Sequence, residues 1–140
     1  MTHNTMIFND QSSLEQFAVE FGQSLIPGDV VTLEGDLGAG KTTFTRALLR
    51  GISNHPTLEV PSPTFSLVQT YQTPKGEIWH FDLYRLEDTQ EVFELGIEEA
   101  LANGIAIIEW PQLIETYLPA HTKRLHIECG EAPHTRMIKF

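Results

Sequence analysis

The sequence predicts an α/β fold, a three-layer sandwich around a mixed, mainly parallel central sheet. Apolar runs of strand length alternate with segments of helical periodicity along the chain, which is typical of α/β proteins. The run Ile105–Ile108 is entirely apolar, as expected for a central strand that is covered on both faces. The apolar run Val30–Leu33 enters a glycine-rich loop, and a helical segment leaves it. This order is the strand–loop–helix unit of phosphate-binding folds.

The N-terminal elements follow from local signals. Thr5–Phe8 is predicted to be a short strand. Asp10, Ser12 and Ser13 offer N-caps, and Glu15 follows Ser12 by three residues as in a capping box. The helix that they start is predicted from apolar residues at helical spacing, namely Leu14, Phe17, Ala18, Phe21 and Leu25. Pro27-Gly28-Asp29 is predicted to be a turn, and the helix after the glycine-rich loop is expected to end near Gly51.

The remaining elements are predicted in the same way from periodicity and from turn residues. We expect an irregular segment over 54–63, strands over 67–72 and 77–81 joined by a hairpin turn at 73–76, a helical segment over 86–101 interrupted at Gly96, a short helix over 113–117, and two closing strands over 124–129 and 135–140.

Composition limits the class of protein. The 140 residues suffice for one domain, which we place over residues 1–140. Nine Lys and Arg against nineteen Asp and Glu give a formal net charge of −10. Such a charge argues against an extended nucleic-acid surface and suits a basic protein partner. The acidic residues between 87 and 99 are interpreted as a solvated helix face, with a docking surface as the alternative.

Location and redox state are constrained by the same composition. Apolar runs are only a few residues long, so no membrane span is expected. Met1–Thr5 lacks the basic and then apolar pattern of a secretory signal, and the cytoplasm is the expected location. Cys129 is the only cysteine, which excludes an internal disulfide, and its apolar strand predicts a buried thiol.

The glycine-rich loop carries the most specific motif. Gly35–Thr42 matches G-x-x-x-x-G-K-[ST], the loop whose backbone N–H groups hold phosphates. Lys41 is placed to reach the β- and γ-phosphates, and the Thr42 hydroxyl to ligate Mg²⁺. The alternative is a strand–helix turn that binds nothing. The motif therefore predicts a single P-loop nucleotidase domain.

A phosphate loop needs an acidic partner, which normally follows a neighbouring apolar strand. Ile78–Phe81 leads into Asp82, and Ile105–Ile108 leads into Glu109. Because Trp110-Pro111 stops the second strand at its carboxylate, we favour Glu109 as the acid on the metal side. Asp82 is then the acid on the γ-phosphate or water side. Solvated carboxylates at strand ends are the alternative for both.

Three further residues are candidates near these acids. Thr64 lies in Ser62-Pro63-Thr64-Phe65, a proline-stiffened segment that resembles a switch sensing the γ-phosphate, with an ordinary turn as the alternative. Trp110 is expected to pack over the site or to stack on a partner group, unless it is a plain core or rim aromatic. His80 is interpreted as a merely buried or surface histidine; the alternative is that it orients Asp82, because the two residues share a strand face.

The absence of two sequence features limits the identity of the nucleotide and the class of enzyme. No Asn-Lys-x-Asp stretch is present, so the usual guanine reader is absent and ATP is favoured by elimination. Small nucleotide kinases normally clamp two phosphorylated substrates with several arginines. This chain has only Arg46, Arg50, Arg85, Arg124 and Arg136.

The ordered motifs resemble the bacterial TsaE (YjeE) family. They are Gly35–Phe44, then Ser62–Phe65, then His80-Phe81-Asp82-Leu83-Tyr84-Arg85, then Glu109-Trp110-Pro111, and the resemblance runs from about Asp10 to beyond Pro111. It implies a small ATPase that works with the TsaB and TsaD proteins to make threonylcarbamoyladenosine at position 37 of tRNA. It also implies that the family member does not itself transfer the threonylcarbamoyl group and meets tRNA only through the complex.

The resemblance also implies residue roles. Lys41, Asp82 and Glu109 serve catalysis, while Thr42 and Glu109 hold Mg²⁺. The residues expected at the ATP are Gln11, Gly35, Asp36, Leu37, Gly38, Ala39, Gly40, Lys41, Thr42, Thr43, Thr64, Asp82, Trp110 and Arg136. Two other functions stay open: a nucleotide-gated binding module whose hydrolysis is incidental, and a small-molecule kinase.

Overall fold

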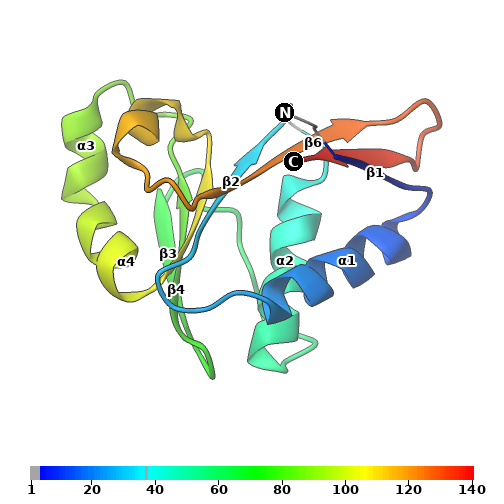
Figure 1. Cartoon of the computed structure of the whole chain (residues 1–140), viewed down its shortest axis with the longest axis horizontal. Coiled ribbons are helices and arrows are strands. Elements are labelled where there is room, and N and C mark those ends of the chain that lie inside the picture. Colours follow the sequence, from blue (N-terminus) through cyan, green and yellow to red (C-terminus); the bar gives the residue numbers. More distant parts are fainter. Residues whose placement is uncertain (1–3, 37) are drawn as a thin grey trace. The chain divides into compact units, whose positions relative to one another are not determined.

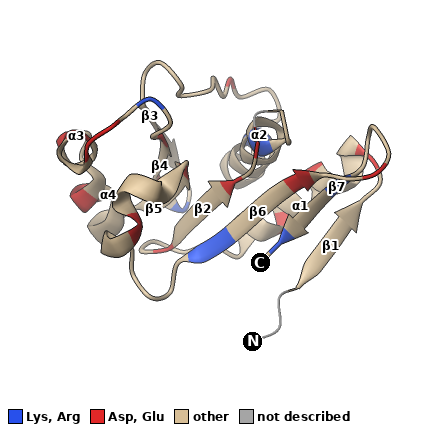
Figure 2. Ribbon diagram, turned by 90° about the horizontal axis from the view of Figure 1, so that it is seen from above, with Lys and Arg blue, Asp and Glu red and all other residues tan. Residues whose placement is uncertain are grey.

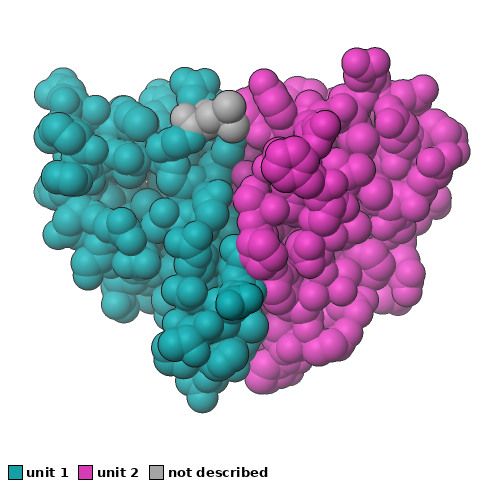
Figure 3. Space-filling model, turned by 180° about the vertical axis from the view of Figure 1, so that it is seen from behind, with its two compact units in different colours: residues 1–24, 34–60, 124–140 teal, residues 25–33, 61–123 magenta. Residues whose placement is uncertain are grey.

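The computed structural model describes residues 4–36 and 38–140, which form two compact units. Unit 1 comprises residues 1–24, 34–60 and 124–140, and unit 2 comprises 25–33 and 61–123 (Figure 3). The chain therefore passes between the units four times, and neither unit is continuous in sequence. That the whole chain acts as one ATPase domain stays a prediction.

Unit 1 combines two helices with an antiparallel ribbon (Figure 1). Its elements are β1 (Thr5–Phe8), α1 (Gln11–Gln23), α2 (Lys41–Ser53), β6 (Lys123–Cys129, of which Lys123 falls in unit 2) and β7 (Arg136–Lys139). The strands follow the order β1-β7-β6, and both pairings are antiparallel. The predicted closing hairpin is thus confirmed, and the first strand of the chain pairs with the last.

Close packing of α1 against α2 holds unit 1 together. A Cβ added at Gly22 would lie 3.0 Å from the Leu48 side chain, and one at Gly51 would lie 3.0 Å from Val19. The two glycines therefore let the helix backbones approach closely. Phe17 is the centre of an aromatic cluster with Phe8, Phe21, Phe44 and Phe140, whose ring centroids lie 5.3–6.2 Å from its own.

Unit 2 is built on a mixed set of strands. Its elements are β2 (Val30–Glu34, of which Glu34 falls in unit 1), β3 (Val68–Thr73), β4 (Gly76–Asp82), α3 (Thr89–Glu94), α4 (Ile97–Asn103), β5 (Ile105–Glu109) and the 3-10 helix η1 (Pro111–Tyr117). The strand order is β2-β5-β4-β3. β2, β5 and β4 are parallel, and β3 forms the predicted antiparallel hairpin with β4.

β5 is the central strand of unit 2, as its apolar sequence predicts. All five of its residues are buried. Figure 1 shows α3 and α4 beside β3 and β4, and the core between them includes Phe81, Val92, Ile97 and Ile108. Burial of apolar surface of this kind is the main favourable term in folding. The acidic residues of α3 and α4 are exposed, as both the solvated face and the alternative docking surface require (Figure 2).

The predicted mixed α/β fold is confirmed, with parallel pairing limited to β2, β5 and β4 among the described pairings of each unit. The N-cap of α1 is Asp10, one of the three candidates, rather than Ser12 with its capping box. Two other local predictions differ from the structure. Helix α2 passes through Gly51 and ends at Ser53, with Asn54 in the left-handed conformation. Cys129 is exposed, not buried.

Within residues 4–36 and 38–140, every helix is too short or too polar to cross a lipid bilayer.

Candidate active site

The phosphate loop of unit 1 depends on glycines with positive φ. Gly35, Gly38 and Gly40 have φ of 146°, 83° and 112°, values that L side chains rarely adopt. A Cβ on Gly35 would overlap the backbone oxygen of Ile127, so this position has no room for a side chain. The Ala39 N–H donates to the Asp36 carbonyl at 3.0 Å and makes the turn tight. Leu37 lies outside the described residues.

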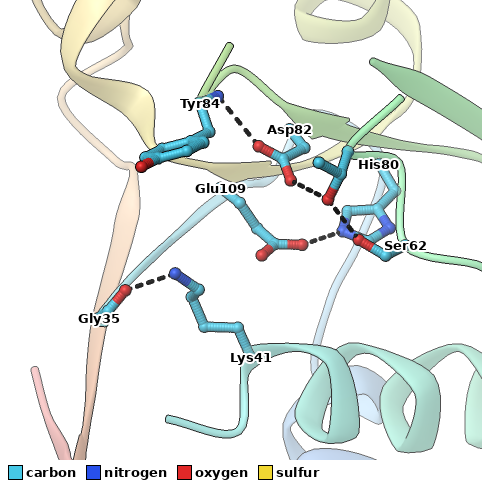
Figure 4. Close-up of polar contacts among 8 residues, drawn as sticks. Gly35, Lys41, Ser62, His80, Asp82, Tyr84 and Glu109 are labelled. Atoms are coloured by element: carbon cyan, nitrogen blue, oxygen red, sulfur yellow. Dashed lines mark hydrogen bonds and ion pairs between the residues drawn. The ribbon is translucent and has the colours of Figure 1, made fainter. Parts of the chain in front are cut away.

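Helix α2 begins immediately after the loop, at Lys41. Its N-cap is Gly40, which supplies no side-chain cap. The first backbone N–H groups of a helix have no intrahelical acceptor, and the helix dipole adds positive potential at this end. The Lys41 side chain is 5% exposed, and its ammonium donates to the Gly35 carbonyl (Figure 4). Positive charge is therefore concentrated on the loop, which suits an anion.

A pocket of about 130 Å³ opens beside this loop within unit 1. Its lining residues are Gln11, Leu14, Gly38, Gly40, Thr43, His134 and Arg136. Five of these residues are predicted nucleotide contacts, so the structure brings Gln11 and Arg136 together with the loop although they come from opposite ends of the chain.

Arg136 is held in place by local contacts. Its Nη1 donates to the carbonyls of Pro133 and Thr135 at 3.1 and 3.0 Å, and a Cβ on Gly40 would lie 3.7 Å from its Nε. Sequence reasoning missed Leu14 and His134. No spacing signal could have found them, because only the fold places them beside the loop.

The candidate acids form a second group, within unit 2. β4 ends at Asp82 and β5 ends at Glu109, as predicted. The parallel register pairs Asp82 with Glu109, and paired residues on neighbouring strands point to the same face of the sheet. His80 lies two residues before Asp82, so it shares that face. Asp82 and Glu109 are both buried, and each residue is 5% exposed.

Hydrogen bonds fix both oxygens of Asp82. Oδ1 accepts from the Tyr84 N–H at 3.0 Å, and Oδ2 accepts from the Thr64 hydroxyl at 3.1 Å (Figure 4). The Thr64 and Ser62 hydroxyl oxygens lie 2.8 Å apart. Thr64 thus contacts Asp82, and this hydrogen bond joins the segment around Thr64 to the end of β4. Its role as a phosphate sensor stays a prediction.

Glu109 is held by a different partner. The Nε2 atom of His80 lies 2.7 Å from Oε2 of Glu109, and both side chains are buried (Figure 4). An ionised carboxylate only accepts hydrogen bonds, so Nε2 is the donor. His80 is buried, as one of the two interpretations holds. The alternative that it orients Asp82 is wrong, because its Nε2 contacts the other acid.

The backbone after Glu109 is strained. Trp110 has φ of 55°, a conformation that is uncommon for a bulky residue and clusters at functional sites. Its ring centroid lies 4.7 Å from that of Tyr84, whose N–H holds Asp82. Trp110 thus packs on the residue that positions one acid and directly follows the other.

The donor chemistry of the unit 2 acids fits Mg²⁺. Among residues 4–36 and 38–140, no three His, Cys, Asp or Glu side chains group so that they could hold a metal alone. Mg²⁺ is usually held by one or two carboxylates together with substrate phosphates and water, not by an all-protein cage. Two carboxylates side by side in register meet this requirement.

Comparisons with known proteins identify relatives. The family model "Threonylcarbamoyl adenosine biosynthesis protein TsaE" matches residues 8–138. A protein from Rickettsia bellii named "tRNA threonylcarbamoyladenosine biosynthesis protein TsaE" is 43% identical over 119 residues, covering 85% of this chain and 82% of its own length. A Bacillus subtilis protein with the same name is 44% identical over 103 residues, covering 73% of this chain and 63% of its own length.

A solved structure supports the fold. The crystal structure of Bacillus subtilis YdiB matches with a TM-score of 0.72 at 29% identity, covering 99% of this chain and 84% of that chain.

Proposed function

The chain belongs to the TsaE family of threonylcarbamoyl adenosine biosynthesis proteins, and on this premise we propose that it binds and hydrolyses ATP as an accessory protein of tRNA threonylcarbamoyladenosine synthesis. The resemblance of its motifs to this family is confirmed by the family model and the relatives. Its partners are the TsaB and TsaD proteins, its cofactors are ATP and Mg²⁺, and it acts in the cytoplasm. It meets tRNA only through the complex.

The phosphate loop is the observation that supports nucleotide binding. Gly35, Gly38 and Gly40 adopt the positive φ that brings backbone N–H groups inward, and Lys41 is buried beside them. The pocket lined by Gln11 and Arg136 opens on the same loop. A glycine-rich turn with only a structural purpose would not require a buried ammonium, because moving a charge out of water is costly.

The side chains then have separate roles. The Lys41 ammonium binds the β- and γ-phosphates, and the backbone N–H groups of the loop hold the remaining phosphate oxygens. The Thr42 hydroxyl and the Glu109 carboxylate would hold Mg²⁺, which when bound neutralises charge developing on the phosphates. Asp82, fixed through both oxygens, orients the attacking water.

Hydrolysis by the isolated chain is expected to be slow. An arginine supplied by a partner is worth about 10³–10⁵ in rate in related nucleotidases. Arg85 is the internal candidate, but its guanidinium lies 5.0 Å from the centroid of the exposed Phe65 ring. We therefore propose that a partner protein completes the charge stabilisation.

The first test replaces the loop lysine. Lys41→Ala removes the phosphate-binding charge, so ATP binding measured by calorimetry and turnover measured by phosphate release should both be lost. Lys139→Ala is the control, because this exposed lysine pairs with Glu128 on the ribbon of unit 1. Wild-type hydrolysis by Lys41→Ala would refute the assignment.

The second test measures dependence on partners. ATP turnover is compared for the chain alone and for the chain with TsaB and TsaD. We expect stimulation of at least about 10³-fold if a catalytic arginine is supplied in trans. Equal rates with and without the partners would contradict the proposal.

A nucleotide-gated binding module is the second candidate. The hydrogen bond from Thr64 to Asp82 favours it, because it links an exposed segment to a candidate catalytic acid. Nucleotide binding that changes this bond would change the Ser62–Phe65 surface. Asp82→Asn and Glu109→Gln distinguish this candidate from the ATPase proposal. If hydrolysis is lost while tRNA modification by the complex continues at the full rate, the chain is a nucleotide-gated binding module.

A further inference from the structure

We propose that His80 is the positioning residue that sets the metal-binding geometry of Glu109. This inference rests on the proposed function, in which Glu109 holds Mg²⁺. It assigns a role to a buried histidine that neither the phosphate loop nor the water-activating acid uses.

The contact is short and fully enclosed. Nε2 of His80 lies 2.7 Å from Oε2 of Glu109, and the side chains are 1% and 6% exposed. A buried carboxylate is costly unless its oxygens have hydrogen-bond donors. The His80 N–H meets this need at Oε2 and leaves Oε1 outside the bond, so the carboxylate is held in one rotamer.

The second ring nitrogen of His80, Nδ1, indicates that this residue does more than fill space in the core. Its Nδ1 is buried without a hydrogen-bond partner among the described residues, which is unfavourable. Ile78 lies two residues earlier on the same strand and is completely buried, so an apolar side chain is accommodated on this face. The presence of a histidine with an unsatisfied Nδ1 at this position is explained by the hydrogen bond that its Nε2 makes to Glu109.

The strand register makes the arrangement rigid. β4 and β5 are parallel neighbours, with His80 opposite Ile107 and Asp82 opposite Glu109. The ring therefore reaches diagonally to Glu109 while Asp82 is held by Tyr84 and Thr64. Each acid has its own donors, so each is oriented independently. Residues that orient metal ligands typically change metal affinity or activity by about 10- to 100-fold when they are removed.

The experiment compares His80→Asn with His80→Gln, whose amide side chains differ in length. The amide nitrogen of glutamine can occupy the place of the imidazole Nε2, whereas that of asparagine is one carbon shorter. His80→Asn should raise the Mg²⁺ concentration for half-maximal ATP turnover, in the presence of the partners, by about 10- to 100-fold. His80→Gln should have a Mg²⁺ concentration for half-maximal turnover much closer to that of the wild type. ATP affinity in EDTA and the thermal midpoint should be similar in the two variants.

The control is His121→Asn. The Nε2 of His121 also contacts an oxygen, the Gly28 carbonyl at 2.9 Å, but on an exposed side chain. It should leave the Mg²⁺ dependence unchanged. If His80→Asn keeps the wild-type Mg²⁺ dependence, or if both His80 variants lose activity only in proportion to their thermal midpoints, the inference is wrong.

A measurement on the unaltered protein covers the case in which the variants do not fold. Nitrogen NMR of the wild-type chain should show His80 protonated at Nε2, with a resonance that shifts when Mg²⁺ is added to the ATP-bound protein. No shift at saturating Mg²⁺ overturns the inference. Failure of the proposed function has a different signature, because wild-type protein with its partners would then show no Mg²⁺-dependent turnover and Glu109→Gln would change nothing.

Discussion

Gly35 and Gly38 occupy the same loop with the same sign of φ, but their surroundings differ. A Cβ on Gly35 would overlap the Ile127 carbonyl oxygen, whereas a Cβ on Gly38 would meet nothing within 4 Å. Both replacements strain the backbone. Only the first also forces two backbone segments apart. The two positions therefore separate conformational strain from steric conflict.

Gly38→Ala should lower the free energy of unfolding by roughly 1–2 kcal/mol, the usual penalty for a left-handed residue other than glycine. Gly35→Ala should lower it further, because the neighbouring strand backbone must move. Denaturant unfolding of both variants measures the difference. Equal losses would show that the Ile127 backbone yields easily.

The main site residues could be predicted from local sequence, because a motif and two strand ends mark them. Lys41, Asp82 and Glu109 lie where the sequence places them in their elements. The partner of His80 could not be predicted. It depends on which strand lies beside β4 and on the register of that pairing, and neither is encoded locally.

At the scale of the element, helix α1 is started by one exposed carboxylate. Oδ1 of Asp10 accepts from the Ser13 N–H at 2.8 Å. This backbone hydrogen bond, with a smaller contribution from the Ser13 side chain, lowers the pKa of Asp10 below its ordinary value of 3.8. The charged form is thus favoured in the folded state.

The stability of α1 should consequently depend on pH. Because the folded pKa is depressed, the stabilisation by Asp10 is present above about pH 3.8 and is lost as the pH falls through the lowered pKa. Asp10→Asn keeps a capping oxygen without the titration. Its free energy of unfolding should therefore change less between pH 5 and pH 2 than that of the wild type.

Asp10→Ala is the matched control, since it should lose the cap at every pH. Parallel pH profiles for the wild type and Asp10→Asn would show that Asp10 does not titrate in this way.

Errors at the ends of elements have a common physical cause. Asp10, Ser12 and Ser13 are all good caps, and the position where the chain leaves β1 selects Asp10. Gly51 suggested a helix end, but its missing side chain is used for packing against Val19. Cys129 is exposed because it lies at the end of β6, where apolar neighbours in sequence no longer imply burial.

At the scale of the whole molecule, charge decides which partners are favoured. A net charge of −10 repels a polyanion at long range, whereas the loop glycines and Lys41 are proposed to bind a small anion locally. This combination agrees with a protein that binds a nucleotide but meets tRNA only through other subunits.

The purified chain alone should therefore not retain tRNA at moderate salt. Filter binding with labelled tRNA measures this, with the complete complex as the positive control. Tight retention by the chain alone would contradict the inference, because binding of phosphate backbones depends on clustered cations.

The pairing of β1 with β7 has a consequence for biosynthesis. Asn4 and Phe140 exchange backbone hydrogen bonds at 3.3 and 3.0 Å, and Thr5 lies opposite Lys139. A ribosome releases the first strand long before it makes the partner of that strand. Until β7 has been made, β1 lacks the strand with which it pairs in the folded protein. Truncated translation products should therefore be prone to aggregation.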